Sequence, residues 1–256
     1  MSRETGEIER RDVAVWDRRL FSALRAALRV GYFSLEVIGA EHVPRSGPVV
    51  YVGNHGGWFA LDALVFALAV HDHVGPDRIP YAVVEDVLVR APGLREFFRP
   101  LGVIPASRMR HPGTLPKEIE TFGFFPEGSA GICKPFWQAY RMKPWRSGFV
   151  RLALLRGARV VPVSLVGSEE CLPTLGGLPL FERWIKAPIP LPLSLVPLPA
   201  RWRIAFGPPV DLGRSDPEGA RDTAFCRSAA ARVQAVVQAQ LDAHTKDRLL
   251  RRWRAR

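Results

Sequence analysis

The sequence predicts a single α/β domain whose mostly parallel or mixed sheet is flanked by helices. Short apolar runs, such as 49–52 and 158–166, have the length of buried strands. Apolar or amphipathic stretches long enough for helices, such as 60–70 and 147–155, alternate with these runs, which is typical of β–α units. The 256 residues contain no internal repeat or linker-like stretch, so we expect one domain with its core between about 33 and 210.

The individual elements follow from local patterns. Apolar residues recur at helical spacing from Val13 and Trp16 onward, with arginines between them, so an amphipathic helix is expected over 13–30. Proline recurs too often in 188–199 for a helix, and we expect an extended loop that packs on the core or dips into lipid. A long C-terminal helix is expected over 216–250. Further strands are expected at 32–39, 79–84, 103–104, 122–125 and 202–206, short helices at 92–99 and 114–120, and disorder over 1–12.

The net charge of +11 favours a polyanionic partner, such as an anionic membrane surface, an acidic substrate or nucleic acid. The alternative is an arginine-rich surface without such a partner. No zinc-finger or RNA-recognition signature accompanies the charge, so we expect no nucleic acid. The helix over 13–30 has two interpretations: it lies in a membrane interface with Trp16 toward lipid, or it covers the core of the domain.

Targeting and redox signals are sparse. Residues 1–12 are polar with no apolar segment behind them, which argues against a signal peptide, and no run of about 18 apolar residues predicts a membrane span. Cys133, Cys171 and Cys226 form no C-x-x-C pair, so neither a zinc site nor a disulfide framework is expected. We expect reduced thiols and peripheral binding at the cytoplasmic face of the cell membrane.

A histidine lies on a glycine-rich turn between an expected strand and an expected helix. His55 follows the apolar run 49–52, and Asp62 falls in the first turn of the helix, where a carboxylate suits the helix dipole. One interpretation is a dyad in which Asp62 fixes the imidazole tautomer and the second ring nitrogen takes a proton from a hydroxyl. The glycines would then let substrate approach the backbone. The other interpretation is a buried, hydrogen-bonded histidine beside a helix-capping aspartate.

Two further expected strands end in turns with charged residues. Arg108 follows the short strand at 103–104, and Glu127 follows the strand at 122–125. Ligands gather beyond the carboxyl ends of strands in open α/β sheets, so these side chains and His55 are expected at one crevice. Taken singly, Arg108 is also compatible with a solvated turn residue, and Glu127 with a turn carboxylate that bonds backbone N–H groups.

Together these features resemble the glycerolipid acyltransferase family, whose best-known members acylate lysophosphatidate. That family has four ordered motifs: a histidine followed by an aspartate, G-x-I-x-x-x-R, a segment beginning F-P-E-G, and an apolar strand with V-P-V. The sequence matches them in order at Asn54-His55 with Asp62, at Gly102, Ile104 and Arg108, at Phe125-Pro126-Glu127-Gly128, and at Val161-Pro162-Val163. Any single match is weak, and the agreement of all four over about 49–166 carries the resemblance.

The resemblance implies a role for each matched position. His55 resembles the general base that deprotonates the acceptor hydroxyl, and Asp62 the carboxylate that orients it. Acyl-CoA or acyl carrier protein is implied as the donor co-substrate and a lysolipid as the acceptor, without a metal, a cofactor or a covalent acyl-enzyme. The implied substrate-binding residues come from the first three motifs: Asn54, Gly102, Arg108, Phe125, Pro126, Glu127 and Gly128.

The sequence departs from the family pattern in three places. Asp62 lies two residues beyond the usual H-x-x-x-x-D spacing, and we expect a bulge over 56–59 to restore the dyad. The third motif continues S-A-G where the family often has T-R-S, so an arginine is missing at Ala130, and Lys134 is the candidate to replace it. The segment between the second and third motifs is shorter than usual, which predicts a more open or differently shaped acceptor pocket.

The expected activity is therefore acyl transfer from a thioester to a glycerolipid hydroxyl in phospholipid biosynthesis. Lysophosphatidate or a related lysophospholipid is the expected acceptor, and a neutral mono- or diacylglycerol is the alternative. A lipid hydrolase is disfavoured because the G-x-S-x-G elbow is absent. The shifted Asp62 also permits a non-catalytic lipid-binding protein.

Overall fold

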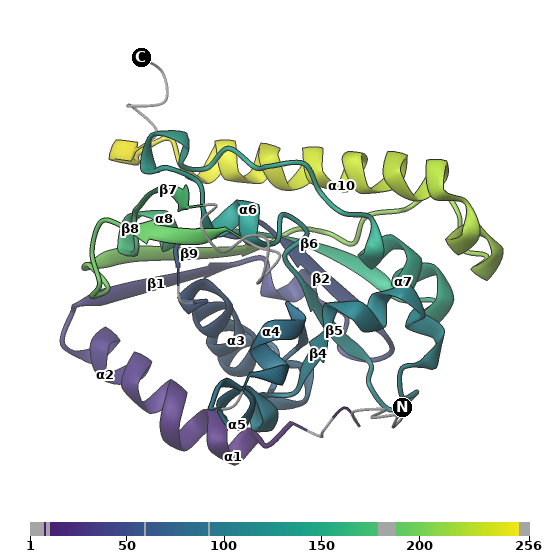
Figure 1. The fold of residues 1–256 in the computed structure, drawn as a ribbon, viewed down its shortest axis with the longest axis horizontal. Coiled ribbons are helices and arrows are strands. Elements are labelled where there is room, and N and C mark those ends of the chain that lie inside the picture. Colours follow the sequence, from purple (N-terminus) through teal and green to yellow (C-terminus); the bar gives the residue numbers. More distant parts are fainter. Residues whose placement is uncertain (1–7, 9–10, 59, 92, 179–187, 251–256) are drawn as a thin grey trace.

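The centre of the fold is a seven-stranded sheet with the strand order β1-β9-β6-β2-β5-β3-β4 (Figure 1). The computed structural model describes residues 8, 11–58, 60–91, 93–178 and 188–250. The strands of this sheet are β1 (Phe33–Ile38), β2 (Val49–Gly53), β3 (Tyr81–Val84), β4 (Val103–Pro105), β5 (Thr121–Phe124), β6 (Arg159–Val166) and β9 (Ala200–Phe206).

Five neighbouring strands of the sheet run in the same direction. β6 pairs with β2, β2 with β5, β5 with β3 and β3 with β4, all in parallel. β9 is antiparallel to β6 and parallel to β1, so the sheet is mixed. The carboxyl ends of β6, β2, β5, β3 and β4 consequently lie at one edge, where parallel sheets place their ligand sites.

Helices cover both faces of the sheet (Figure 1). α7 (Gly148–Arg156) and the long α10 (Thr223–His244) cover one face, and α2 (Ser22–Arg29) and α3 (Leu61–His73) cover the other. Strand β2 explains how the layers form, because its side chains alternate between two apolar clusters. Val49 and Tyr51 pack with α3, whereas Val50 and Val52 pack with α7 and α10.

The N-terminal amphipathic segment covers the core of the domain. It comprises α1 (Val13–Val15), the π-helical turn η1 (Trp16–Phe21) and α2. Trp16, Phe21 and Leu24 are buried in the cluster around α3, with Trp16 only 7% exposed. Of the two interpretations of residues 13–30, the structure selects the one in which Trp16 points into the protein.

Two predicted helices have different bounds in the structure. The helix predicted over 114–120 is wrong, because only the 3₁₀ turn η6 (Pro112–Thr114) forms and Leu115 is extended at φ −67° and ψ 145°. Leu115 precedes Pro116, and a residue before proline is disfavoured in the helical region. The C-terminal helix begins at Thr223 rather than 216, since Asp222 caps it by accepting a hydrogen bond from Phe225 N. A 3₁₀ turn, η9 (Pro217–Arg221), precedes it.

The proline-rich stretch is extended, as predicted, but its first part forms a strand. β8 (Ile189–Pro192) pairs antiparallel with β7 (Thr174–Leu178), which the sequence did not predict. The remaining short helices are α4 (Asp86–Arg90), α5 (Leu94–Phe98), α6 (Ser129–Ile132) and α8 (Ser168–Cys171), and the remaining 3₁₀ turns are η2 (Ala40–His42), η3 (Pro76–Arg78), η4 (Arg99–Leu101), η5 (Ala106–Arg110) and η7 (Phe136–Gln138).

Within the described ranges, no helix has both the length and the apolar character needed to cross a bilayer. The three cysteines are buried and unpaired. Most of the N-terminal stretch predicted to be disordered, and the basic tail 251–256, lie outside the described residues.

Candidate active site

The histidine turn connects β2 to α3 and forms a histidine–aspartate pair. Asp62 Oδ2 lies 2.6 Å from His55 Nδ1 and also accepts a hydrogen bond from Gly56 N at 3.0 Å. Asp62 Oδ1 accepts a bond from Ala63 N at 2.8 Å, so backbone donors hold the carboxylate. This geometry puts the imidazole proton on Nδ1, and no described residue bonds Nε2. The ring therefore presents Nε2 as a base.

The two extra residues between His55 and Asp62 are accommodated by left-handed backbone. Gly57 has φ +70° and Ala60, at the N-cap of α3, has φ +54°. Glycine adopts this region freely, whereas alanine does so at a cost of about 1–2 kcal/mol. These two positions fold the turn back so that the side chain of Asp62 reaches the imidazole. The turn restores the contact as the sequence predicted, with Phe59 outside the described residues.

The surroundings of His55 raise the pKa of its imidazole. Burial alone would lower that pKa, but the adjacent Asp62 carboxylate outweighs it through its charge and hydrogen bond, and Glu127 adds to the effect. The ring stacks on Phe125, with centroids 4.7 Å apart and planes 11° apart. About 15% of the His55 side chain remains exposed. The ring is thus fixed on two sides and accessible at its remaining edge.

Glu127 acts on the backbone of the histidine turn. Its Oε1 accepts a hydrogen bond from His55 N at 2.9 Å, and its Oε2 accepts one from Lys143 N at 2.7 Å. The side chain is 0% exposed. Both carboxylate oxygens are thus used inside the protein, and the predicted contact of Glu127 with the acceptor stays a prediction. The geometry matches the other interpretation, a turn carboxylate that bonds backbone N–H groups.

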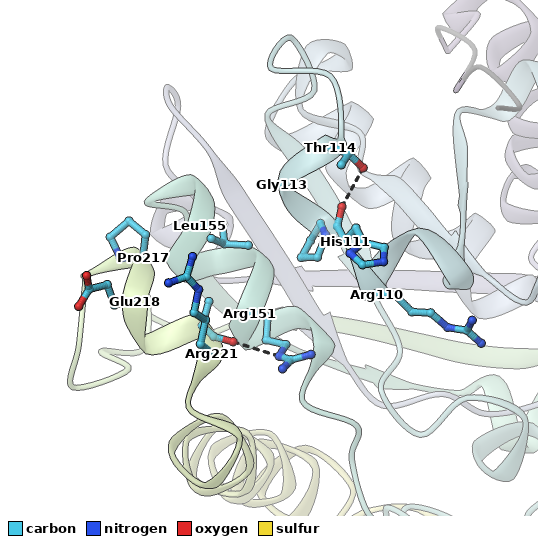
Figure 2. Close-up of a pocket in the computed structure, with 11 residues that line it drawn as sticks. Arg110, His111, Gly113, Thr114, Arg151, Leu155, Pro217, Glu218 and Arg221 are labelled. Atoms are coloured by element: carbon cyan, nitrogen blue, oxygen red, sulfur yellow. Dashed lines mark hydrogen bonds between the residues drawn. The ribbon is translucent and has the colours of Figure 1, made fainter.

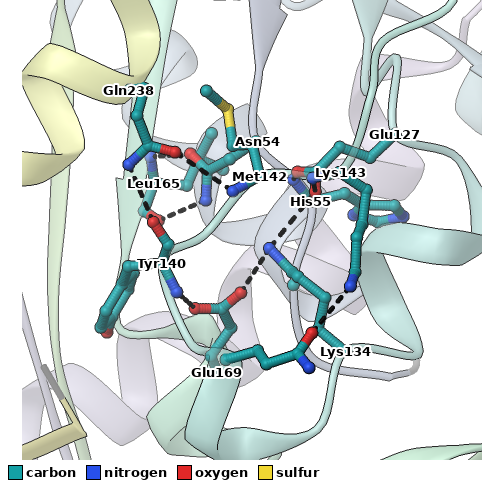
Figure 3. A network of polar contacts seen from close by, with 12 residues as sticks. Asn54, His55, Glu127, Lys134, Tyr140, Met142, Lys143, Leu165, Glu169 and Gln238 are labelled. Carbon is teal, nitrogen blue, oxygen red and sulfur yellow. Dashed lines mark hydrogen bonds and ion pairs between the residues drawn. The ribbon is translucent and has the colours of Figure 1, made fainter. Parts of the chain in front are cut away.

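Lys134 is buried between two carboxylates (Figure 3). Its Nζ lies 3.3 Å from Glu127 Oε2 and 2.7 Å from Glu169 Oε1, and its side chain is 1% exposed. Burial acts to lower the pKa of Lys134, but the two carboxylates reverse the effect and raise it, so the amine stays protonated. The charge of Lys134 is therefore paired inside the protein, and its predicted role as a replacement for the missing arginine stays a prediction.

Glu169 is the member of this network that the sequence analysis missed. It lies in α8, directly beyond the carboxyl end of β6, and accepts a hydrogen bond from Tyr140 N. Tyr140 has φ +61°, and its carbonyl oxygen accepts a bond from Gln238 Nε2 at 2.9 Å. The only sequence signal for Glu169 was its place after a strong strand, because its partners Lys134 and Tyr140 come from another part of the chain.

Asn54 and Gly102 are structural positions. The Asn54 side chain is fully buried and bridges to β6, donating to Leu165 O at 2.9 Å and accepting from Leu165 N at 2.8 Å. Gly102 has φ +68° before β4, at the sheet edge opposite the dyad, and a Cβ there would lie 2.8 Å from Arg11 Cβ. These contacts give both residues a structural role, and their predicted contact with substrate stays a prediction.

Three glycines bring protein segments, rather than substrate, against the histidine turn. A Cβ on Gly56 would lie 2.5 Å from Glu169 Cγ, and one on Gly57 would lie 2.7 Å from Ser168 O. The absence of a side chain at both positions therefore lets α8 pack against the turn. A Cβ on Gly131 would lie 2.9 Å from both Cβ and O of His55. The turn is therefore packed between α6 and α8, and the expectation of a backbone opened for substrate is corrected.

An arginine from outside the four motifs lies beside the turn after β5. Gly128 has φ +58°, and a Cβ there would lie 3.9 Å from Arg146 Cζ. Arg146 N donates to Pro126 O at 3.1 Å, and its guanidinium is 3.5 Å from Glu85 Oε1. The Arg146 side chain is 72% exposed. An accessible guanidinium thus lies beside the third motif, supplied from position 146 instead of 130.

Arg108 lies at the same edge of the sheet as the dyad but farther from it. It sits in the half-buried 3₁₀ turn η5, after β4. Two strands separate β4 from β2, a spacing of roughly 14 Å. Met109, its neighbour, packs 3.8 Å from the position of a Cβ on Gly148, so η5 contacts the start of α7, two residues after Arg146. Arg108 and Arg146 are therefore both close in sequence to the contact between η5 and α7.

A cavity of about 610 Å³ lies between η6, α7 and η9 (Figure 2). Arg110, Arg151 and Arg221 line it together with Glu218, and Arg151 Nε donates to Ala220 O at 3.1 Å. Its lining includes none of the motif residues. The dyad, by contrast, lies at the strand-end edge of the sheet, away from this cavity. Within the described residues, no group of three histidine, cysteine or acidic side chains is arranged to hold a metal ion.

A sequence profile described as Acyltransferase matches residues 34–166, which is more than half of the chain. The chain belongs to the acyltransferase family. The chain is 38% identical over 190 residues to an uncharacterized protein of Mycobacterium leprae, a match that covers 70% of this chain and 51% of that protein. The chain spans about half the length of the mycobacterial relatives that it matches.

More distant relatives carry specific names. A 1-acyl-sn-glycerol-3-phosphate acyltransferase of Borreliella burgdorferi is 22% identical over 167 residues, covering 60% of this chain and 61% of that enzyme. The crystal structure of the lysophosphatidate acyltransferase PlsC of Thermotoga maritima aligns with a TM-score of 0.58 at 18% identity, over 92% of this chain and 84% of that one. The structural likeness shows that the two proteins share a fold.

Proposed function

We propose that this acyltransferase moves a fatty acyl group from a thioester donor, acyl-CoA or acyl carrier protein, to the hydroxyl of a lysophospholipid. The observation that carries the proposal is the 2.6 Å contact between His55 Nδ1 and Asp62 Oδ2, formed despite a spacing two residues longer than usual. The left-handed conformation of Ala60 costs free energy, and it brings Asp62 to the imidazole; an aspartate that served only as a helix cap would not require that conformation. Membership of the family and the dyad together favour a catalyst over a lipid-binding protein.

The reaction follows from the state of the imidazole. Nε2 of neutral His55 takes the proton of the acceptor hydroxyl as its oxygen attacks the thioester carbonyl carbon. Asp62 stabilises the imidazolium that forms. Collapse of the tetrahedral intermediate breaks the C–S bond, and the departing thiolate takes the proton from Nε2. The products are an ester and a free thiol, without a covalent acyl-enzyme.

The acceptor is proposed to carry a phosphate, as lysophosphatidate does. Arg146 lies beside the turn after β5, the strand next to β2, and Arg108 follows β4 at the same edge. Guanidinium groups suit phosphate because their planar forks form paired, charge-assisted hydrogen bonds. In this proposal Arg146 supplies the second cation that Ala130 and the buried Lys134 do not. The enzyme is proposed to work at the cytoplasmic face of the membrane as a peripheral protein.

The test is thiol release from acyl-CoA and acyl carrier protein across a panel of acceptors. Lysophosphatidate should be preferred over monoacylglycerol. Arg108→Ala and Arg146→Ala should each lower kcat/KM for lysophosphatidate about 10-fold or more, because a charge-assisted hydrogen bond contributes about 1.5–3 kcal/mol. Arg159→Ala, an exposed arginine at the amino end of β6, is the matched control. A preference for monoacylglycerol that neither substitution alters would reject the phosphate and favour a neutral acceptor.

A further inference from the structure

The largest exposed aliphatic side chains near the histidine turn come from the proline-rich stretch. Leu193, Leu195 and Val196 are 55%, 76% and 66% exposed. We define the apolar ridge as these residues together with their exposed neighbours in the stretch, Ile189, Leu191 and Leu198. Residues 188–200 include no charged side chain. Contiguous exposed apolar surface of this kind marks a binding face rather than ordinary solvent-exposed protein.

The ridge is fastened to the active site. Trp58, between His55 and Asp62 in the sequence, donates from Nε1 to Ser194 O at 3.1 Å. Leu198 N donates to Cys171 O at 2.7 Å, which ties the ridge to the end of α8, the helix that packs on the glycines of the turn. Whatever the ridge binds is therefore held next to the catalytic histidine.

The backbone of the ridge is suited to a medium without water. Leu193 N donates to Pro173 O at 2.9 Å, and Val196 N bonds Ser194 Oγ at 3.3 Å. Five prolines between 188 and 199 have no N–H to satisfy. Backbone polar groups that enter hydrocarbon must find partners within the protein, and the N–H groups of Leu193 and Val196 do so. A strand edge built to recruit another protein would instead present free N–H groups.

The composition and flanks of the ridge also favour lipid. Protein interfaces concentrate binding energy in tyrosine, tryptophan and arginine, whereas the ridge is leucine, isoleucine, valine and proline. Arginine lies at its borders: Arg201 follows it with a side chain 69% exposed, and Arg29 is exposed next to Val30. Tyr32 OH donates to Pro197 O at 2.6 Å, and this bond holds the segment around Val30 next to the ridge. Cations around an apolar centre complement anionic headgroups around hydrocarbon.

We infer that the apolar ridge inserts into the interface of an anionic phospholipid bilayer and presents the dyad to acceptors in that leaflet. The inference rests on the proposed function only in taking the acceptor to be a membrane lipid. It assigns lipid contact to residues 189–198 rather than to the N-terminal segment, whose Trp16 is buried.

The first experiment is flotation with vesicles of phosphatidylcholine and phosphatidylglycerol. The double substitution Leu195→Glu with Val196→Glu should weaken vesicle binding at least about 30-fold, since two aliphatic side chains are replaced by carboxylates. The matched control, Val236→Glu, changes an exposed aliphatic residue on α10 and should bind like wild type. Equal binding of wild type and the double variant would overturn the inference.

A second measurement does not depend on charged variants that could misfold. Val196→Cys and Val236→Cys, labelled with a polarity-sensitive fluorophore, use the burial of the three native thiols to direct labelling. Vesicles should shift the emission to shorter wavelength only for the label at 196. An unshifted label at 196 on vesicle-bound protein would overturn the inference. So would light scattering that shows a dimer dissociated by the double substitution without any vesicle binding, because the ridge would then bind a second copy.

Activity assays separate this inference from the proposed function. With a short-chain acceptor below its micellar concentration, the double variant should retain wild-type turnover, while its turnover on vesicle-embedded acceptor should fall in parallel with binding. Absence of acyl transfer by the wild type would reject the proposed function and leave the flotation and fluorescence results intact.

Discussion

Two carboxylates bond the same histidine residue at different atoms. Comparing them distinguishes a residue that acts on the reacting ring from one that positions the backbone. Asp62 bonds the ring at Nδ1, whereas Glu127 bonds the backbone N–H. Both are buried, and both belong to sequence motifs. The carboxylate on the ring controls the proton and the tautomer. The carboxylate on the backbone controls where the residue sits, and it is itself held by Lys134. Substitutions should therefore give different kinetic signatures.

The largest effect is expected at the histidine that both carboxylates bond. His55→Ala should lower kcat at least about 10³-fold, because the general base and the partner of Asp62 are lost together. The melting temperature should stay near that of wild type. His71→Ala is the matched control, since His71 also contacts an aspartate, Asp72, at 2.6 Å. Near-normal turnover by His55→Ala would refute the general-base mechanism.

Asp62→Asn should lower kcat by about 10²–10³-fold and also change the pH dependence. A general base must be neutral, so kcat/KM rises with pH through the pKa of His55, which lies above its ordinary value in the wild type. Removing the Asp62 charge leaves burial as the main influence and lowers that pKa, so the rising limb should move to lower pH. The pH–rate profile measures this, and Asp72→Asn should leave it in place.

Lys134→Met should cost stability rather than chemistry. It leaves Glu127 and Glu169 buried without their cation, for which we expect a loss of about 3 kcal/mol. Burial raises the pKa of Glu169, so without Lys134 the native state holds more protons than the unfolded state, and the variant should become less stable as pH rises. Denaturant unfolding at several pH values tests this. Lys143→Met, whose backbone N–H still bonds Glu127, should cost less than about 1 kcal/mol.

The smallest effect is expected for Glu127→Gln. The amide oxygen can still accept from His55 N, but its NH₂ group then faces the donors Lys143 N and Lys134 Nζ. The turn should shift slightly, with kcat reduced about 10-fold and the KM for the acceptor unchanged, because positioning is lost and acceptor contact is not. A raised KM with unchanged kcat would return Glu127 to the acceptor-binding role that the family resemblance implied.

A second contrast shows why two apolar segments with the same predicted role have different environments. The helix over 13–30 and the stretch 188–199 were both candidates for lipid contact. The helix has a partner, because its apolar stripe packs into the cluster around α3, where Trp16 and Phe21 are buried. The stretch has prolines that prevent a helix, and among the described strands it pairs with β7 alone, so several of its leucines remain exposed. The hydrophobicity of a segment can be read from its own sequence, but its burial depends on which other segments the fold packs against it.

The sequence by itself determined the α/β class and most of the strands, and it pointed to His55 and Asp62 as a candidate pair, whose contact the structure then showed. Buried parallel strands carry continuous apolar runs, and a histidine–carboxylate pair seven residues apart is a local arrangement, so both can be recognised within short windows. Only the tertiary structure decided the roles of Asn54, Glu127 and Lys134, which appear polar and available in the sequence but are used up by Leu165, His55 and Glu169. It also decided that Arg146 lies beside the third motif. Each of these outcomes depends on contacts between distant segments, and a buried polar group is satisfied by whichever partner the fold brings to it.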